Sequence, residues 1–220
     1  MEEYWTKKNA LLFPDVGRNQ LNRETEGARG KNSIDDSDIN KILWLWEENT
    51  MEFKEVVKNR YSCKKFSDRQ VEGEKLKAIL EAGRLAPTAK NLQEQHVYVV
   101  QANEMLAKVD AVTPCRYGAP TVLVVAYDKN NVFTYPGGKR DSGVEDATIV
   151  ATHMILAAAD EGVDSCWINF LDPEKMAAAL ELPENEEVLM VMDLGYAAEG
   201  IGPLPKHTDR KPLEQTVSFM

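Results

Sequence analysis

Cations and hydroxyls alternate in one short segment of the chain. Arg60, Ser62 and Lys64 occupy every second position, with Tyr61 between the first two. In an extended segment, alternate side chains project to the same side. Guanidinium, ammonium and hydroxyl groups arranged in this way can converge on a phosphate. The segment therefore predicts an anion site, weighed against the commoner interpretation that a run of charges is a solvated surface.

A second polar stretch, residues 86–93, connects a predicted helix to a predicted strand. It contains Pro87, Thr88, Asn91 and Gln93, and its two amides are spaced so that they can project together. Side-chain amides offer both donors and acceptors, which suits the edge of a ring that carries carbonyls and ring nitrogens. This stretch predicts contacts with a heterocycle.

Two further cations, Arg210 and Lys211, stand close to the C-terminus. The chain as a whole is acidic, with 26 Lys and Arg against 36 Asp and Glu and a formal charge of −10. This balance argues against nucleic acid as the main partner, because neutralising many phosphates needs a basic surface. A few cations gathered in an acidic chain instead indicate a small ligand that carries a phosphate and a heterocycle.

The remaining composition excludes several other classes of protein. Cys63, Cys115 and Cys166 are widely spaced and odd in number, which is not typical of a disulfide framework. Cys115 and Cys166 stand beside or within apolar runs, where a buried, inert thiol is the plain interpretation. The histidines and cysteines show no metal-ligand spacing. No apolar run is long enough to span a bilayer, and no apolar signal region opens the chain. We expect a cytoplasmic protein.

The composition and the hydrophobic pattern of the sequence change near Met51. Residues 19–40 are mostly polar and charged, with few apolar side chains to bury, so we expect that stretch to be flexible. One hypothesis is that Met51 is the natural start and that residues 1–50 are a translated leader. The alternative is a genuine N-terminal extension whose tryptophans pack on the body. In both cases, residues 51–220 are predicted to form the working domain.

From Met51 onward, helix and strand signals alternate. Amphipathic or Ala-rich patterns predict helices at residues 51–60, 72–85, 104–109, 146–161 and 173–180. Apolar runs predict strands at residues 96–101, 121–127, 165–169 and 188–194. Runs that are apolar on successive residues are expected to be covered on both faces. We therefore predict one central sheet sandwiched by helices, in an α+β or α/β protein.

The chain closely resembles the FMN-dependent nitroreductase family over about residues 51–218. The resemblance rests on the order of the segments RYSCKKF, APTAKNLQ, DSCWIN with DPEKMAAALELPENE, DLGY and RKPL. It implies an α+β three-layer fold with a central mixed sheet flanked by helices, in an interlocked homodimer with FMN at the subunit interface. It also implies that NADH or NADPH reduces the FMN, and that a nitroaromatic, quinone or similar small acceptor then takes the electrons in a ping-pong mechanism.

The resemblance assigns roles to the cationic segments. Arg60, Ser62 and Lys64 match the family's Arg-x-Ser-x-Arg motif, which binds the flavin phosphate and the pyrimidine edge. Lys64 replaces the commoner arginine, so the charge survives but the bidentate fork does not. Arg210 matches a C-terminal phosphate-binding arginine, with Lys211 as a helper.

A second group of residues is assigned by the resemblance to the flavin ring. The loop that ends at Gln93 contacts the flavin, often from the second protomer. In many relatives a proline and an aromatic residue follow it, whereas Glu94 and Gln95 follow here, which leaves the substrate preference open. Asn169 and Phe170 fall beside the reactive flavin N5, with the backbone amide of Phe170 as the relevant group. The full set of implied cofactor-binding residues is Arg60, Tyr61, Ser62, Lys64, Pro87, Thr88, Asn91, Gln93, Asn169, Phe170, Arg210 and Lys211.

Two alternatives stay open beside this interpretation. The same fold could use its flavin for reductive dehalogenation or ene reduction. The protein could also bind a flavin without turnover, as a carrier or redox sensor. No metal is expected, and no side chain is expected to act as a nucleophile, because the flavin carries the redox chemistry.

Overall fold

The computed structural model describes residues 52–220. Its helices are α4 (Phe53–Asn59), α5 (Gly73–Arg84), α6 (Asn103–Val112), α7 (Gly143–Asp160) and α8 (Pro173–Leu180), and its strands are β1 (Gln95–Val100), β2 (Thr121–Asp128), β3 (Asp164–Ile168) and β4 (Glu186–Gly195). Three short 3-10 turns, η1 (Ala89–Asn91), η2 (Pro114–Arg116) and η3 (Leu213–Gln215), complete the elements. The elements fall close to the predicted ranges. The predicted N-terminal extension, residues 1–50, and the proposed start at Met51 lie outside the described residues.

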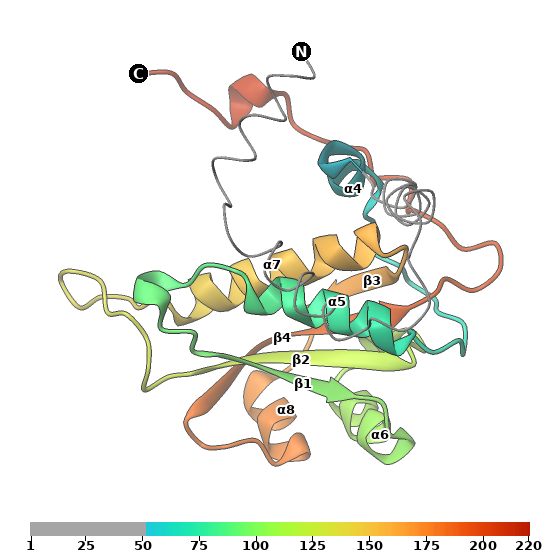
Figure 1. The fold of residues 1–220 in the computed structure, drawn as a ribbon, viewed down its shortest axis with the longest axis horizontal. Helices are drawn as coiled ribbons and strands as arrows, with labels where there is room; N and C mark the ends of the chain where they lie inside the picture. Colours follow the sequence, from blue (N-terminus) through green and yellow to red (C-terminus); the bar gives the residue numbers. More distant parts are fainter. Residues whose placement is uncertain (1–51) are drawn as a thin grey trace, which may run out of the picture. The chain divides into compact units, whose positions relative to one another are not determined.

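The four strands form one sheet in the order β1-β2-β4-β3, in which each neighbouring pair is antiparallel (Figure 1). The α+β class is confirmed. The strand directions differ from the expected mixed sheet: within residues 52–220, parallel pairing is limited to an isolated bridge between Ser62 and Ser165. An apolar run shows that a strand is covered on both faces, but it does not specify the direction of its neighbours.

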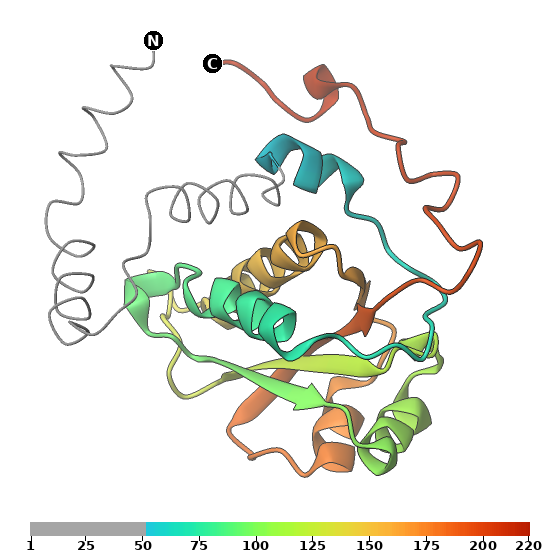
Figure 2. The same ribbon diagram turned by 45° about the vertical axis from the view of Figure 1, so that its right-hand side comes forward.

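Helices cover both faces of the sheet. Helices α5 and α7 lie on one face, and α6 and α8 lie on the other (Figures 1 and 2). On the first face, Leu123 and Met192 belong to the same core cluster as Met154 of α7. On the second face, Val124 and Val191 belong to a separate cluster. Successive residues of β2 are therefore buried, which explains why its sequence is apolar without alternation.

Helix α7 sets the distance between the segments that pack at its two ends. It has 18 residues, which at about 1.5 Å per residue separates its ends by about 27 Å. Its first turn packs closely on β2, because a side chain at Gly143 would collide with the ring of Tyr127. The helix ends at Asp160, and Gly162, which has a positive φ of 66°, lies in the short turn that leads to β3. No helix within residues 52–220 is long and apolar enough to cross a membrane.

After β4, the chain leaves the body of the domain. Residues 199–220 are exposed except for His207, and the segment runs past α4 and away from the sheet (Figure 2). Several large apolar side chains on it are exposed, among them Leu213, Val217 and Phe219. This segment carries Arg210 and Lys211.

Candidate functional site

Ser62 and Cys63 pair with the backbone of strand β3. Ser62 forms its parallel bridge with Ser165, and the N–H of Cys63 donates to the Ser165 carbonyl at 2.9 Å. Ser62 and Lys64 both make side-chain hydrogen bonds with Cys166 of β3. Ser62 and Lys64 therefore project to the same side of this segment, whereas the direction of Arg60 stays a prediction.

Lys64 is half-buried and keeps its charge. Its Nζ lies 3.1 Å from the Cys166 Sγ and 4.6 Å from the centroid of the Tyr117 ring. Burial favours the neutral amine, but the contacts with Cys166 and Tyr117 raise the pKa of Lys64 above its usual value. Burial raises the pKa of the Cys166 thiol and outweighs the effect of Lys64. The protonated thiol leaves the cation without an anionic partner at this contact.

A buried acid, Asp193, lies beside this cation. Asp193 of β4 pairs in register with Cys166 of β3 and is fully buried. Within the described part of the chain, neither of its carboxyl oxygens has a hydrogen-bond partner. Burial raises its pKa to about 9, against the opposing charges of Arg116 and Lys64. Asp193 is therefore protonated and neutral at pH 7.

The end of α4 and the C-terminal segment meet near this site. Arg60 and Tyr61 line a cavity of about 120 Å³ with the beginning of β3. The ring of His207 makes an edge contact with Tyr61, with centroids 6.4 Å apart, and this contact brings the C-terminal segment to the same place. The Arg210 guanidinium donates to two carbonyls of its own segment, at 2.7 and 2.8 Å. Lys211 is exposed.

The loop of residues 87–93 has a strained backbone. Lys90, Asn91 and Gln93 all have a positive φ, of 53°, 56° and 53°. This left-handed conformation is unfavourable for residues other than glycine, and asparagine tolerates it best. Pro87, Asn91 and Gln93 are exposed. Such a loop persists only where surrounding contacts hold it.

Several contacts hold this loop, and in two of them a side chain binds a backbone N–H of the loop. The N–H of Gln93 donates to the Thr88 Oγ1 at 3.0 Å, which closes the loop on itself. The N–H of Ala89 donates to both carboxylate oxygens of Asp146, at 3.1 and 3.0 Å. Asp146 lies in the first turn of α7, so the loop is fixed to the N-terminal end of that helix.

Asn169 and Phe170 follow β3 directly. The indole N–H of Trp167 donates to the Asn169 side chain. The Phe170 carbonyl accepts a hydrogen bond from the Thr113 hydroxyl at 2.7 Å, while its side chain is 73% exposed. The carbonyl of Phe170 is thus held by Thr113 while its ring is exposed, and the role expected of its backbone amide stays a prediction.

The predicted site residues thus fall into two places in one chain. Residues 60–64, Arg210, Asn169 and Phe170 are gathered around β3, which follows the C-terminal end of α7. The loop of residues 87–93 is fixed to the first turn of that helix, whereas Arg60 lines a cavity with Ala159 at the last turn, and the helix is about 27 Å long. One chain does not bring the cations and the amides together.

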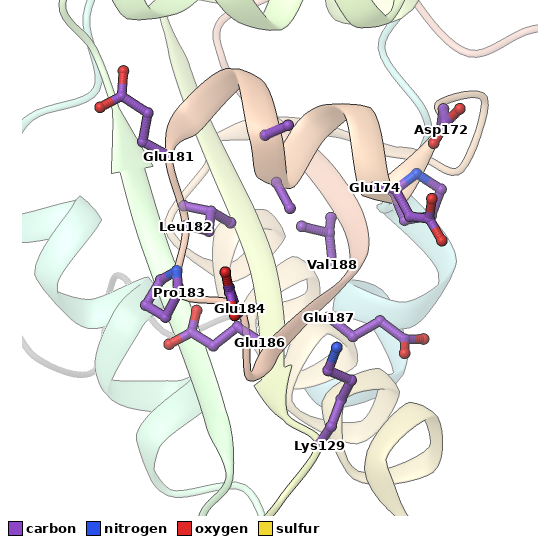
Figure 3. A pocket seen from close by; sticks show the side chains of 13 residues that line it. Lys129, Asp172, Glu174, Glu181, Leu182, Pro183, Glu184, Glu186, Glu187 and Val188 are labelled. Atoms are coloured by element: carbon purple, nitrogen blue, oxygen red, sulfur yellow. The ribbon is translucent and has the colours of Figure 1, made fainter.

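A cavity of about 670 Å³ lies elsewhere, between α8 and the beginning of β4 (Figure 3). It contains none of the predicted residues. Its charged lining consists of one cation and six acids: Lys129, Asp172, Glu174, Glu181, Glu184, Glu186 and Glu187. A cavity with this surplus of negative charge repels a phosphate. Within residues 52–220, no group of His, Cys, Asp or Glu has the arrangement of a metal site.

Three acidic residues near the two places were missed by reasoning from the sequence. Asp193 has a visible signal, because it is a charged residue inside an otherwise apolar run. Glu94 also has one, because it stands where many relatives have a proline. Asp146 has none, since acidic residues in a first helical turn are common.

Comparison with known proteins identifies the class. The sequence profile of the Nitroreductase family matches residues 57–113 and 114–196. A protein of Archaeoglobus fulgidus named as an NADH dehydrogenase/NAD(P)H nitroreductase is 32% identical over 149 residues, which are 64% of this chain and 83% of that protein.

Solved structures agree with this match. A nitroreductase family protein from Clostridium difficile 630 superposes with a TM-score of 0.72 at 35% identity, over 77% of this chain and 98% of that one. A nitroreductase with bound FMN from Bacteroides fragilis has a TM-score of 0.63 at 28% identity, over 78% of this chain and all of that one. The fold and the ordered polar segments define an α+β protein of the oxidoreductase class. The chain belongs to the nitroreductase family.

Proposed function

We propose that this protein is an FMN-dependent NAD(P)H oxidoreductase that works as a homodimer with FMN at the subunit interface. One observation carries the proposal: the cations of residues 60–64 and the amides of residues 87–93 are fixed at opposite ends of α7. Each place is half of a site for a phosphate-bearing heterocycle. Two copies of the chain, related by a two-fold axis, can complete two such sites.

The donors around β3 fit the phosphate end of FMN. Arg60 and Arg210 supply guanidinium groups, and Ser62 supplies a hydroxyl, which is the chemistry that proteins use for phosphate oxygens. His207 brings the Arg210 segment to the end of α4, so both arginines reach the same end of the molecule. The hydrogen bonds of Arg210 to its own carbonyls are weak enough to exchange for a charged ligand.

Lys64 fits the role of a cation beside the flavin ring. Its neighbour Asp193 is neutral and its neighbour Cys166 is a thiol, so its positive charge is uncompensated in a half-buried place. In such surroundings a charge acts more strongly than it does in water. Lys64 can therefore stabilise negative charge that develops on the ring, while the Asn91 and Gln93 amides of the other protomer bind the ring's polar edge.

When bound, FMN would accept a hydride from NADH or NADPH and pass electrons to a nitroaromatic, quinone or similar small acceptor in a ping-pong cycle. The chain's own residues bind the phosphate, orient the ring and supply the local charge. The exposed apolar side chains of the C-terminal segment favour the proposed dimer, because a second subunit could bury them.

The test uses the full-length purified protein. FMN is added and its binding is followed by fluorescence and by absorbance near 450 nm, a wavelength expected for bound flavin; mass photometry gives the oligomeric state. We expect a dimer that binds about one FMN per chain and is bleached anaerobically by NADH or NADPH. A colourless protein that takes up no FMN contradicts the proposal, and bound FMN that neither nicotinamide reduces favours a carrier or redox sensor.

The acceptor is then identified by steady-state assays with both nicotinamides. Nitroaromatics and quinones are compared with halogenated phenols and activated alkenes at equal concentration. We expect the first two classes to give the highest kcat/KM. Preference for a halogenated phenol or an alkene would instead support a dehalogenase or an ene-type reductase on the same fold.

A further inference from the structure

A hairpin, residues 133–142, lies beside the loop of residues 87–93. It runs out from the end of β2 and returns to the start of α7 (Figure 1). Thr134 and Asp141 form an antiparallel bridge that closes its two arms. Its tip, residues 136–138, is exposed. The hairpin is therefore an ordered projection of the surface next to the loop that carries the amides.

Two aromatic rings hold cations on this surface. The Nζ of Lys90, in the loop, lies 4.6 Å from the centroid of the Phe133 ring. The guanidinium carbon of Arg140 lies 4.4 Å from the centroid of the Tyr135 ring. The centroids of the two rings are 5.4 Å apart. Because a cation over an aromatic face is attracted to it, Lys90 and Arg140 are held on one continuous surface that joins the hairpin to the loop.

The cations of this surface are available to an anion. Lys90, Lys139 and Arg140 are exposed, and within residues 52–220 none of them forms an ion pair. Between Asp128 and Asp141 the chain has no acidic residue, although its formal charge as a whole is −10. A local excess of positive charge in an acidic protein attracts an anionic ligand to one place on the surface.

Two acids stand close to the hairpin, and each already has a donor. The Asp141 Oδ1 accepts a hydrogen bond from the N–H of Gly143 at 3.0 Å, and Glu145 accepts one from the Tyr135 hydroxyl. In the part of the chain that the structure describes, the Arg140 guanidinium donates no hydrogen bond. Its planar fork of donors is therefore open to a ligand, and that fork matches the oxygens of a phosphate.

The place of this surface indicates which phosphate it suits. The flavin phosphate is assigned to the cations around β3, at the other end of α7. The hairpin instead adjoins the amides that we propose to bind the flavin ring, and the reductant has to approach that ring. NADPH differs from NADH by one phosphate on the 2′ position of its adenosine ribose, and an arginine beside that ribose is a known means of binding it.

We infer that Lys90, Lys139 and Arg140 form a binding site for the 2′-phosphate of NADPH, and that the protein therefore uses NADPH in preference to NADH. The value of this site for turnover rests on the function proposed above. The rings of Phe133 and Tyr135 hold two of the cations in place before the ligand arrives, which lowers the entropic cost of binding. The site selects the donor and takes no part in the transfer of the hydride.

The first test measures the binding of two probes to the full-length protein by calorimetry at low ionic strength. The probes are adenosine 2′,5′-bisphosphate and adenosine 5′-monophosphate, and wild type should bind the bisphosphate about tenfold more tightly. Arg140→Ala should weaken the bisphosphate about tenfold, the effect of a lost charge-assisted hydrogen bond. Arg140→Lys keeps the charge without the fork and should retain part of that affinity.

Lys77→Ala is the matched control, because it removes an equal charge from an exposed position of α5, and it should bind as wild type does. The inference is overturned if the bisphosphate binds no more tightly than the monophosphate, or if neither binds. It is also overturned if Arg140→Ala keeps wild-type affinity for the bisphosphate.

The second test follows the anaerobic reduction of bound FMN by stopped flow at rising concentrations of NADPH or NADH. Arg140→Ala should raise the Kd for NADPH about tenfold and leave both the Kd for NADH and the limiting rate of reduction unchanged. An equal loss for both nicotinamides would show a contact with the diphosphate that they share, and would overturn the inference. If the protein binds no FMN, or neither nicotinamide reduces it, the proposed function fails, while the binding of the two adenosine probes still decides whether this site exists.

Discussion

The two ends of α7 hold their polar segments in different ways. At the C-terminal end, Ser62 and Cys63 pair with the backbone of β3, and Lys64 lies beside a buried thiol and a buried neutral acid. At the N-terminal end, residues 87–93 are fixed by side chains, through Thr88 and Asp146, in a strained conformation. The first segment is extended along a strand, whereas the second can relax as soon as its anchors are lost.

The two segments therefore contribute different properties to a binding site: one contributes positive charge, and the other contributes neutral groups held in a fixed place. The segment beside β3 supplies positive charge in a place of low polarity, where charge acts strongly. The loop supplies neutral amides whose usefulness depends on where the backbone holds them. Because about 27 Å of helix separates them, the comparison predicts a site divided between two chains.

The strongest test of this division is complementation. Arg60→Ala/Lys64→Ala and Asn91→Ala/Gln93→Ala should each abolish NADH- or NADPH-driven turnover. When the two variants are mixed and allowed to exchange subunits, each mixed dimer regains one intact site. Because half of the dimers are mixed, about a quarter of wild-type activity should return. A site built within one chain would show no recovery.

The cations near β3 should contribute more to the affinity for FMN than the amides of residues 87–93 do. Arg210→Ala should weaken binding by about 1.5–3 kcal/mol, because it removes a charge-assisted phosphate contact. Lys211→Ala is the matched control, with the same loss of charge one residue further along, and should cost less than half as much. The Kd from fluorescence titration checks both variants. Equal affinity in wild type and Arg210→Ala would reject the role of this arginine.

Asp193 should make the stability of the folded protein depend on pH. Its pKa is raised by burial to about 9, so above the unfolded-state value of Asp the unfolded chain releases a proton that the folded chain keeps. Stability should therefore fall between about pH 4 and pH 9. Asp193→Asn should remove a decrease in the free energy of unfolding on the order of 4 kcal/mol between pH 5 and pH 8, measured by urea unfolding. The exposed Asp68→Asn serves as the control, and an unchanged slope in Asp193→Asn would show that Asp193 is ionised in the native protein.

A methyl group added at the N-terminal end of α7 should destabilise the protein more than one added against the middle of that helix. A methyl group at Gly143 meets the rigid ring of Tyr127, whereas one at Gly83 meets the flexible side chain of Met154. We expect Gly143→Ala to lower the free energy of unfolding by about 1–3 kcal/mol. Gly83→Ala should change it by less than about 1 kcal/mol, because better helix propensity offsets the contact. Unfolding curves of the two variants check this order, and the reverse order would contradict it.

Reasoning from the sequence located the elements well and the polar segments individually. The helix predicted at residues 173–180 has the bounds of α8, which the structure shows to be capped by Asp172 with Pro173 in its first turn. Arg60, Ser62 and Lys64 were predicted to project to one side; Ser62 and Lys64 both contact Cys166, and the direction of Arg60 stays a prediction. These features depend on neighbouring residues, so local patterns are enough to predict them.

The sequence by itself determined the class of the fold, the order of the elements and the residue types that suit a flavin. Only the tertiary structure decided that the sheet is antiparallel, that Asp193 lies beside Cys166, and that Lys90 lies over the ring of Phe133. The reason is physical: these contacts join residues far apart in the chain, and the burial that shifts the proton affinity of Asp193 exists only once distant segments have packed.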